Sequence, residues 1–365
     1  MIIINKTKKS PGGLFMRHCY FLGSTSPDGF KTSFSDIIND DKFYTYILKG
    51  GPGTGKSTLM KKVASMYPDE TDLYYCSSDT SSLDAIVLNE KKIIVVDGTA
   101  PHTFDPVFPG VSQEIVNLGD FWNKTGLEKN KEAIRYLANE NSLYHAKARR
   151  YIKALAGINN DILFTSANAL LTEKTEKYTE KFCRKIFNSN EKSDFCPKEY
   201  RQLSAFTSNG YCTCEISDEY KIYTLKDNLF SAGDLFLRKL SDTAEKCGVK
   251  CIVSKSYAFN EPIYEHVLLP ELKIAVMSSN FINNFTTEKS SSINLSGFYQ
   301  KEIITARKNT LSFDKKVSTE ILSEITKTID TALDIHDRLE KYYIDSLRTT
   351  RLNKFSEQFI SMINK

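Results

Sequence analysis

Apolar residues in the first hundred positions alternate between short strand-like runs and helical spacing. Phe43 to Leu48 is an aromatic and β-branched run, which predicts a strand. Leu59 to Tyr67 has apolar residues at helical spacing, and Pro68 ends this helix. The runs 72–76 and 92–97 predict two further strands. Strands that alternate with helices indicate an α/β fold.

The segment before these elements predicts a β-hairpin. Residues 1–13 have the character of a loose leader, and 17–22 is a plausible strand. Ser26-Pro27-Asp28-Gly29 is a turn signal. We therefore expect 30–34 to return as the partner strand of 17–22.

A long helical pattern occupies residues 124–187. Apolar residues recur there at three- and four-residue spacing, with a break at Gly157. The pattern predicts two long antiparallel helices that pack like a coiled coil. Such a hairpin is a lid, an arm for a protein partner or a packing element, and the sequence leaves these alternatives open.

The second half of the chain repeats the first. Each short match is weak alone, but five follow one another in the same order, and this order argues for duplication. The matched stretches are 25–30 with 206–211, 46–49 with 223–226, 59–63 with 236–240, 86–96 with 267–277, and 117–122 with 294–299.

The length of 365 residues suits two such units. We predict a first unit at 1–187, in which a helical hairpin spans about 121–187. A polar linker at 188–199 precedes a second unit at 200–365, whose C-terminal helices span about 313–365.

Composition narrows the class of protein. The chain is 41% hydrophobic and 26% charged, with a net charge of +4 and both signs interspersed. This charge is too weak to indicate a nucleic-acid or membrane surface. We find no signal peptide or transmembrane run and expect a cytoplasmic protein. The eight cysteines lack the spacing of a zinc site, so we expect ordinary thiols.

The strongest chemical signal is Gly50-Gly51-Pro52-Gly53-Thr54-Gly55-Lys56-Ser57-Thr58. It matches the phosphate-loop pattern G-x-x-x-x-G-K-[ST], between a predicted strand and a predicted helix. The glycines allow the backbone amides to approach an anion, and residues 51–58 are the expected nucleotide-binding set. Lys56 is expected to reach the β- and γ-phosphates, and Ser57 to ligate Mg²⁺.

Asp97 is the second candidate in this site. It ends an apolar strand downstream of the loop, in the manner of a Walker B aspartate, and is expected to hold Mg²⁺ directly or through water. Gly98 stands where a catalytic glutamate is common. The candidates for the base are therefore Asp79, His102 and Glu114, each of which is equally suited to a capping or surface role.

The second half lacks this chemistry. The lysine position of its loop, 227–234, is Gly233, and the serine position is Asp234, which would repel a triphosphate. Ser278 stands at the position of Asp97. We therefore predict one nucleotide per chain, bound by the first half.

These motifs resemble those of the P-loop NTPases. Lys49 to Ser57, Cys76-Ser77-Ser78-Asp79 and Val96-Asp97-Gly98-Thr99-Ala100-Pro101-His102, followed by a degenerate copy, resemble a bacterial family of internally duplicated P-loop ATPases. The resemblance covers nearly the whole chain. It implies a P-loop three-layer α/β sandwich, internally duplicated, each half followed by a long helical hairpin, and it implies ATP binding. The second copy in that family often keeps its phosphate loop, whereas this chain does not.

Three functions remain open. The leading one is a Mg-ATP hydrolase, in which helical arms report the nucleotide state to a protein partner. An arginine assists: Arg201 or Arg238 of the second half, or alternatively Arg17, Arg149 or Arg150 of the first. The alternatives are a nucleoside, nucleotide or other small-molecule kinase, and a non-hydrolysing protein whose interactions are gated by nucleotide.

Overall fold

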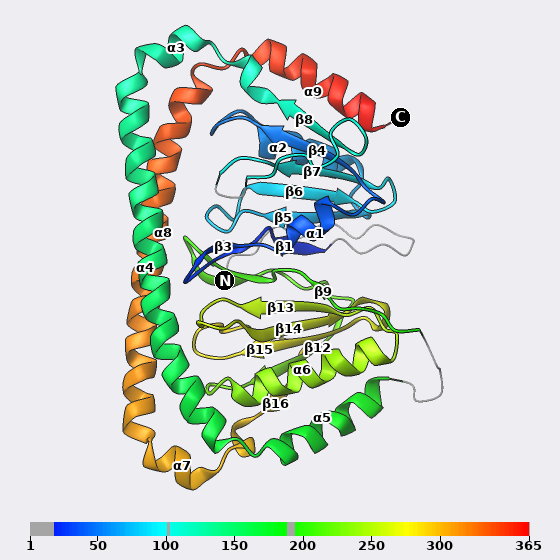
Figure 1. Cartoon of the computed structure of the whole chain (residues 1–365), viewed down its shortest axis with the longest axis vertical. Helices are drawn as coiled ribbons and strands as arrows, with labels where there is room; N and C mark the ends of the chain where they lie inside the picture. The colour runs from blue at the N-terminus through cyan, green and yellow to red at the C-terminus, as the bar shows by residue number, and fades with distance from the viewer. Residues whose placement is uncertain (1–17, 101–102, 188–193, 365) are drawn as a thin grey trace.

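A computed structural model describes residues 18–100, 103–187 and 194–364. Two six-stranded sheets lie one above the other in Figure 1, and two long helices run along one side of both. The protein is therefore mixed α/β with a duplicated layout, as the sequence predicted. The predicted leader, Arg17, His102 and residues 188–193 of the predicted linker lie outside the described residues.

The first sheet belongs to residues 18–122. From here on, "first unit" means these residues and not the whole predicted range 1–187. Strand β4 (Tyr44–Lys49) is parallel to β7 (Ile93–Asp97) and β8 (Gln113–Asn117), whereas β6 (Leu83–Leu88) is antiparallel to both of its neighbours. The strands predicted at 43–48, 72–76 and 92–97 are present within a residue or two. In spatial order the strands are β1 (Cys19–Phe21), β5 (Thr71–Tyr75), β6 (Leu83–Leu88), β7 (Ile93–Asp97), β4 (Tyr44–Lys49) and β8 (Gln113–Asn117).

The second sheet belongs to residues 199–299, the second unit, and repeats this order and these strand directions. The registers agree as well: Leu48 pairs with Asp97 in the first sheet, and Leu225 pairs with Ser278 in the second. The duplication extends to the hydrogen-bonded framework. The strands, from the edge equivalent to β1, are β9 (Glu199–Tyr200), β13 (Ile252–Ser256), β14 (Ile263–Leu269), β15 (Ile274–Ser279), β12 (Lys221–Lys226) and β16 (Ser291–Asn294).

A small hairpin follows the edge strand in each unit. β2 (Ser24–Ser26) pairs with β3 (Gly29–Lys31), and β10 (Ser204–Thr207) pairs with β11 (Gly210–Thr213). The turn predicted at 26–29 is confirmed, but the predicted pairing of 17–22 with 30–34 is wrong. β1 instead pairs with β5, because its apolar residues are buried in the sheet.

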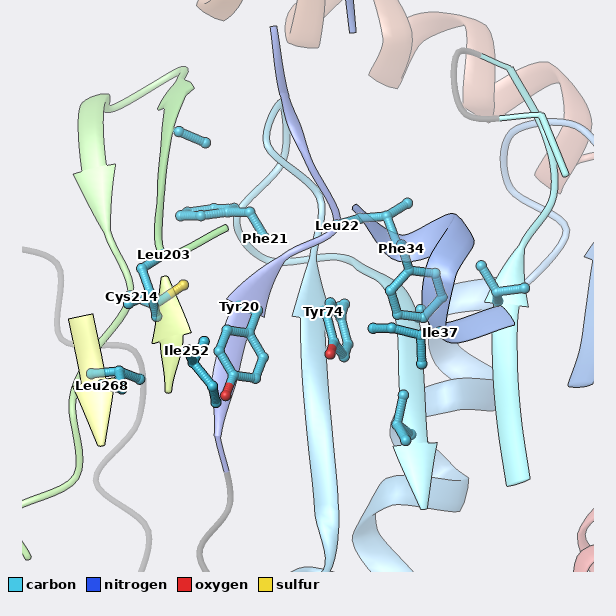
Figure 2. Packing of buried hydrophobic residues seen from close by; sticks show 14 of the residues in the cluster. Tyr20, Phe21, Leu22, Phe34, Ile37, Tyr74, Leu203, Cys214, Ile252 and Leu268 are labelled. Atoms are coloured by element: carbon cyan, nitrogen blue, oxygen red, sulfur yellow. The ribbon is translucent and has the colours of Figure 1, made fainter. Parts of the chain in front are cut away.

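The two units meet at their edge strands. Phe21 forms an antiparallel bridge with Gln202, the residue equivalent to it in the second unit. Buried side chains from both units form one apolar cluster across this contact. Figure 2 shows Tyr20 and Phe21 of β1 on the side of the cluster next to Leu203 and Ile252. The two sheets remain separate and do not merge into one.

One helix follows the central strand of each unit. α2 (Lys56–Met66) packs against β6, and α6 (Ser231–Lys246) packs against β14. Their buried positions correspond: Leu59 and Met60 of α2 match Phe236 and Leu237 of α6. The shorter helical segments are α1 (Phe34–Ile38), η1 (Leu118–Phe121), α3 (Lys124–Lys129), η2 (Pro270–Leu272), η3 (Ser296–Phe298) and α7 (Lys301–Ala306).

The long helices differ from the predicted hairpins. α4 (Lys131–Ala169) passes through Gly157 without a break and packs antiparallel along α8 (Lys308–Ile344) (Figure 1). A glycine weakens a helix by about 1 kcal/mol, and the packing of one long helix on another outweighs this cost. The predicted hairpin of helices within each half is therefore wrong, because each half supplies one helix of a pair that the two halves share.

The helices that follow α4 and α8 pack on the opposite unit. α5 (Thr172–Ile186) leaves the end of α4 and packs on α6 of the second unit. α9 (Thr349–Ile363) leaves the end of α8 and packs on the first sheet beside α2. Each half of the chain thus lends its last helix to the other half (Figure 1).

Equivalent backbone bridges fix these crossings. Leu170 at the end of α4 pairs with Tyr299 of the second unit, and Leu347 after α8 pairs with Trp122 of the first unit. Both pairs are related by the same shift of 177 residues, because 347 − 170 and 299 − 122 agree. The exchange is therefore symmetric.

In the described part of the chain, no helix is both long and apolar enough to cross a membrane.

This exchange predicts that α9 stabilises the first unit. Phe359 is 2% exposed and makes an edge contact with Tyr46 of β4, with 5.1 Å between ring centroids. We expect Phe359→Ala to reduce the free energy of unfolding by about 3–5 kcal/mol. Met362→Ala, at a position that is 42% exposed on the same helix, should cost less than about 1 kcal/mol. Urea denaturation of both variants measures the difference, and equal losses would contradict the packing described here.

Candidate functional site

The glycine loop, residues 50–55, connects the end of β4 to the start of α2. Gly53 has φ of +69° and Gly55 has φ of +82°. These left-handed conformations strain a residue that has a Cβ, so glycine suits both positions. The strand, loop and helix occur where the sequence predicted them.

The amides of this loop are available to a ligand. Among the described residues, none accepts a hydrogen bond from the amides of Gly53, Gly55 or Lys56. The first amides of a helix have no partner within it, and its N-terminus attracts an anion. Unpartnered amides in a turn of this shape are a binding site suited to phosphate.

Lys56 is the first residue of α2, and its side chain lies along the loop. Its Nζ donates to the carbonyl oxygens of Gly50 at 2.7 Å and Gly51 at 2.9 Å. The same Nζ is 3.5 Å from Oδ2 of Asp97. The lysine charge is therefore held between the loop and the end of β7.

Asp97 is buried at the end of β7, the neighbour of β4. Its Oδ1 accepts hydrogen bonds from the amide of Thr99 at 2.9 Å and from the Thr99 hydroxyl at 2.6 Å. Its other oxygen faces Lys56. Thr99 thus fixes the orientation of the carboxylate.

Ser57 lies beside this pair, next to the start of β6. Its Oγ accepts a hydrogen bond from the amide of Leu83 at 3.0 Å. A hydroxyl oxygen has a second lone pair, which leaves one for a metal ion.

Asp84 is the residue of this site that the sequence analysis missed. It is buried on β6, and burial raises its pKa to about 8, with the nearby negative charge of Asp97 adding to this rise. A charged Asp84 would be costly in this buried site, so Asp84 holds its proton near neutral pH.

The internal repeat contains a signal for Asp84. Strand pairing places Glu265 of β14 at the equivalent position, and burial raises its pKa to about 7. A carboxylate inside an otherwise apolar run occurs in both halves. Alignment of the two halves at this strand therefore identifies the position.

The three candidate bases are placed differently. Asp79 follows β5, and its carboxylate accepts hydrogen bonds from the Ser81 amide and from the Ser81 and Ser82 hydroxyls. Burial opposes the charge of Asp79, but these bonds outweigh it and lower the pKa. Glu114 is exposed on β8 opposite Tyr46, three residues before the end of β4, so it lies away from the loop. His102 lies outside the described residues.

The loop of the second unit contains an internal hydrogen-bond acceptor. Asp227, at the position of Gly50, is buried, and its carboxylate accepts hydrogen bonds from the amides of Gly233 and Leu229, both at 2.9 Å. The Tyr299 hydroxyl donates to the same carboxylate at 2.8 Å and accepts from the amide of Ala232, also at 2.8 Å. The amides that would bind phosphate are thus already used.

This arrangement refines the predicted loss of the second site. From the sequence we expected the loss to follow from the missing lysine at Gly233, from repulsion by Asp234 and from Ser278 in place of an aspartate. In the structure both Asp234 oxygens accept hydrogen bonds from Arg238 Nε, at 2.9 and 2.8 Å. α6 also begins at Ser231, so the loop is shortened into a helix. A cavity of about 10 Å³ remains beside Asp227 and Gly233, which is room for about one water molecule.

The chemistry of the first loop fits a magnesium–nucleotide complex. Free amides and Lys56 match phosphate oxygens, and the Ser57 hydroxyl and Asp97 carboxylate are oxygen ligands of the type that Mg²⁺ prefers. No group of three His, Cys, Asp or Glu side chains suited to a metal occurs within residues 18–100, 103–187 and 194–364. A magnesium ion that takes phosphate and water as its other ligands does not require such a group.

The raised pKa of Asp84 predicts a pH dependence of stability. The unfolded carboxyl loses its proton near pH 4 and the folded one near pH 8, so the free energy of unfolding falls as pH rises between these values. The slope from this group reaches at most about 1.4 kcal/mol per pH unit. Asp84→Asn should flatten it in urea denaturation without Mg²⁺ or nucleotide, and Glu265→Gln should flatten its own part up to about pH 7. An unchanged slope in both variants would show that neither carboxyl keeps its proton.

Comparisons with known proteins give no relative on which to base an assignment. No protein-family model matches the chain, and neither a curated protein nor a solved structure matches it.

Proposed function

We propose that the first unit binds Mg-ATP and hydrolyses it, and that the second unit binds no nucleotide. The observation that carries this proposal is the contrast between the two loops. The amides of Gly53, Gly55 and Lys56 are free in the first. In the second, the amides that correspond to those of Gly55 and Lys56 are bonded: Ala232 donates to the Tyr299 hydroxyl and Gly233 to the Asp227 carboxylate. On this account the first loop is a P-loop, and each sheet with its helices is a P-loop α/β sandwich.

The residues of the first unit divide the binding between them. The loop amides hold the phosphate oxygens, and Lys56 leaves the Gly50 and Gly51 carbonyls far enough to contact the β- and γ-phosphates. Ser57 and Asp97 hold Mg²⁺, which neutralises phosphate charge. Asp84, protonated beside Asp97, adds no second negative charge to the site.

Hydrolysis transfers the γ-phosphoryl group to water: the water oxygen bonds the γ-phosphorus, the bond from this phosphorus to the oxygen bridging the β-phosphate breaks, ADP leaves with that oxygen, and the attacking water releases a proton to solvent. Positioning and charge stabilisation supply most of the catalysis of this reaction. None of the described candidates for the base is free and placed at the loop. We therefore expect slow turnover.

This slow chemistry favours a second candidate, a nucleotide-gated interaction protein. Asp79 is engaged by Ser81 and Ser82, and Gly98 supplies no carboxylate after Asp97. The long α4–α8 pair connects the loop to the second unit and suits a transmitting arm. A small-molecule kinase is the third candidate, distinguished by the need for an acceptor.

Binding is tested by titration calorimetry with ATP and Mg²⁺. We expect one ATP per chain and at least a hundredfold weaker binding in Lys56→Ala, because the phosphates lose their lysine. Gly233→Ala is the matched variant in the second loop. Its added Cβ would meet Asp227 at 3.5 Å, an ordinary contact, so affinity should stay within twofold. Two ATP molecules per chain would refute the single site.

Turnover separates the three candidates. We expect phosphate release from ATP with Mg²⁺ alone, at a low rate that Lys56→Ala abolishes. Tight binding with no release, with or without a panel of nucleosides, would establish the nucleotide-gated protein. Release of ADP that requires a nucleoside or sugar would establish the kinase.

A further inference from the structure

The segment between α8 and α9, residues 340–352, packs against the glycine loop; we call it the α8–α9 junction. A Cβ built on Gly53 would lie 2.8 Å from Cγ1 of Ile344 and 3.0 Å from the Glu340 carbonyl oxygen. A Cβ on Gly55 would lie 3.5 Å from Leu352. The loop of the first unit is thus in van der Waals contact with a segment that the second half contributes.

Backbone hydrogen bonds fix the junction in this place. The amide of Asn123 donates to the Ser346 carbonyl at 2.7 Å, and the amide of Arg348 donates to the Phe121 carbonyl at 2.9 Å. Trp122 lies between these bonds, and its ring is 3.1 Å from a Cβ built on Gly51. The same three-residue stretch, 121–123, therefore touches the glycine loop and holds the junction.

Two arginines of the junction lie next to the contact with Gly55. Arg348 precedes α9, and its carbonyl accepts the Leu352 amide, so it is one helical turn from the residue that packs on Gly55. Arg351 is the neighbour of Leu352 in sequence. Both are exposed, and neither guanidinium has an ion-pair partner among the described residues.

The other arginines considered from the sequence are engaged or distant. Arg238 is bonded to Asp234, and Arg201 pairs with Glu199, both within the second unit. Arg149 and Arg150 lie on α4, and Arg17 lies outside the described residues. These placements leave the junction as the source of free arginine at the loop.

The second unit provides an internal control. The shift of 177 residues places Leu171 and Lys174 at the positions of Arg348 and Arg351. Lys174 donates to the Gly297 carbonyl at 2.7 Å. Of these two equivalent pairs of positions, the pair in the α8–α9 junction therefore carries the arginines.

We propose that Arg348 and Arg351 bind the terminal phosphate of ATP, so that the second half of the chain completes the nucleotide site of the first. This inference rests on the proposed binding of ATP at the glycine loop. A guanidinium binds phosphate with two parallel hydrogen bonds and stays charged at all relevant pH values. Residues 340–352 carry three basic and two acidic side chains, so the junction brings net positive charge to the loop.

The arrangement couples nucleotide state to the helix pair. The γ-phosphate attracts Arg348 and Arg351 at the end of α8, and its loss as inorganic phosphate removes that contact. Because α8 packs along α4 over most of its length, the effect of the γ-phosphate reaches both units. Charge donated in this way also stabilises the transition state of phosphoryl transfer.

The test uses the full chain with Arg348→Ala, Arg351→Ala and the double variant. Calorimetry measures affinity for ATP and for ADP, and phosphate release measures turnover. We expect the double variant to lose at least tenfold in affinity for ATP while ADP binding stays within twofold, and to lose at least tenfold in turnover. Arg348→Lys with Arg351→Lys should recover part of the ATP affinity, because lysine keeps the charge without the two-pronged geometry.

Two control variants accompany these. Lys174→Ala changes the position equivalent to Arg351, and Lys354→Ala changes an exposed lysine further along α9; both should leave ATP affinity and turnover within twofold. If the wild-type chain binds ATP but the double variant also stays within twofold for ATP affinity and turnover, the arginine assignment is overturned while the nucleotide site stands. If the wild-type chain binds no ATP, the proposed function and this inference both fail.

Discussion

The antiparallel packing of α4 on α8 is the constraint on which the rest of the structure depends. These helices of 39 and 37 residues span both units, so each delivers the chain to the opposite unit before it folds back. α5 is thereby placed on the second sheet and α9 on the first. The hydrophobic face of each sheet is covered by a helix from the other half, and neither unit has a complete core of its own. Separate folding of the two halves is therefore disfavoured.

The two units share this framework, but the backbone amides of their loops differ: those of the first loop are free, and those of the second are bonded within the chain. In the first, glycines leave the amides free and Lys56 is held near Asp97. In the second, Asp227 supplies from within the chain the acceptor oxygens that a phosphate would bring, and the Tyr299 hydroxyl bonds to one of them. A buried carboxyl group that accepts amide hydrogen bonds satisfies the same backbone groups and removes the need for a ligand. The loop of the second unit is therefore occupied by a side chain of the protein itself, which suits this unit to a structural or regulatory role.

The local features were predictable from sequence, and the long-range ones were not. Three features follow from the order and spacing of residues along the chain: the loop 50–58, the position of Asp97 at the end of a strand, and the duplication. The exchange of α5 and α9 does not, because the apolar stripe of a helix shows that it packs but not on which partner. The helix break predicted at Gly157 is absent for a similar reason, because the packing of α4 on α8 outweighs the local cost of one glycine. Asp84 and the proposed phosphate ligand Arg348 come near the loop only through contacts between segments distant in sequence.

The central claim is that the glycine loop of the first unit, covered by the α8–α9 junction, is the one phosphate site of the described chain. Photolabelling with an ATP analogue that carries an aryl azide on its γ-phosphate tests this most directly, with labelled peptides mapped by mass spectrometry. The account predicts label on peptides that contain residues 340–352 and the region around Lys56, and protection by excess ATP. Protected label on residues 227–234, or its absence from the first unit, would contradict the account.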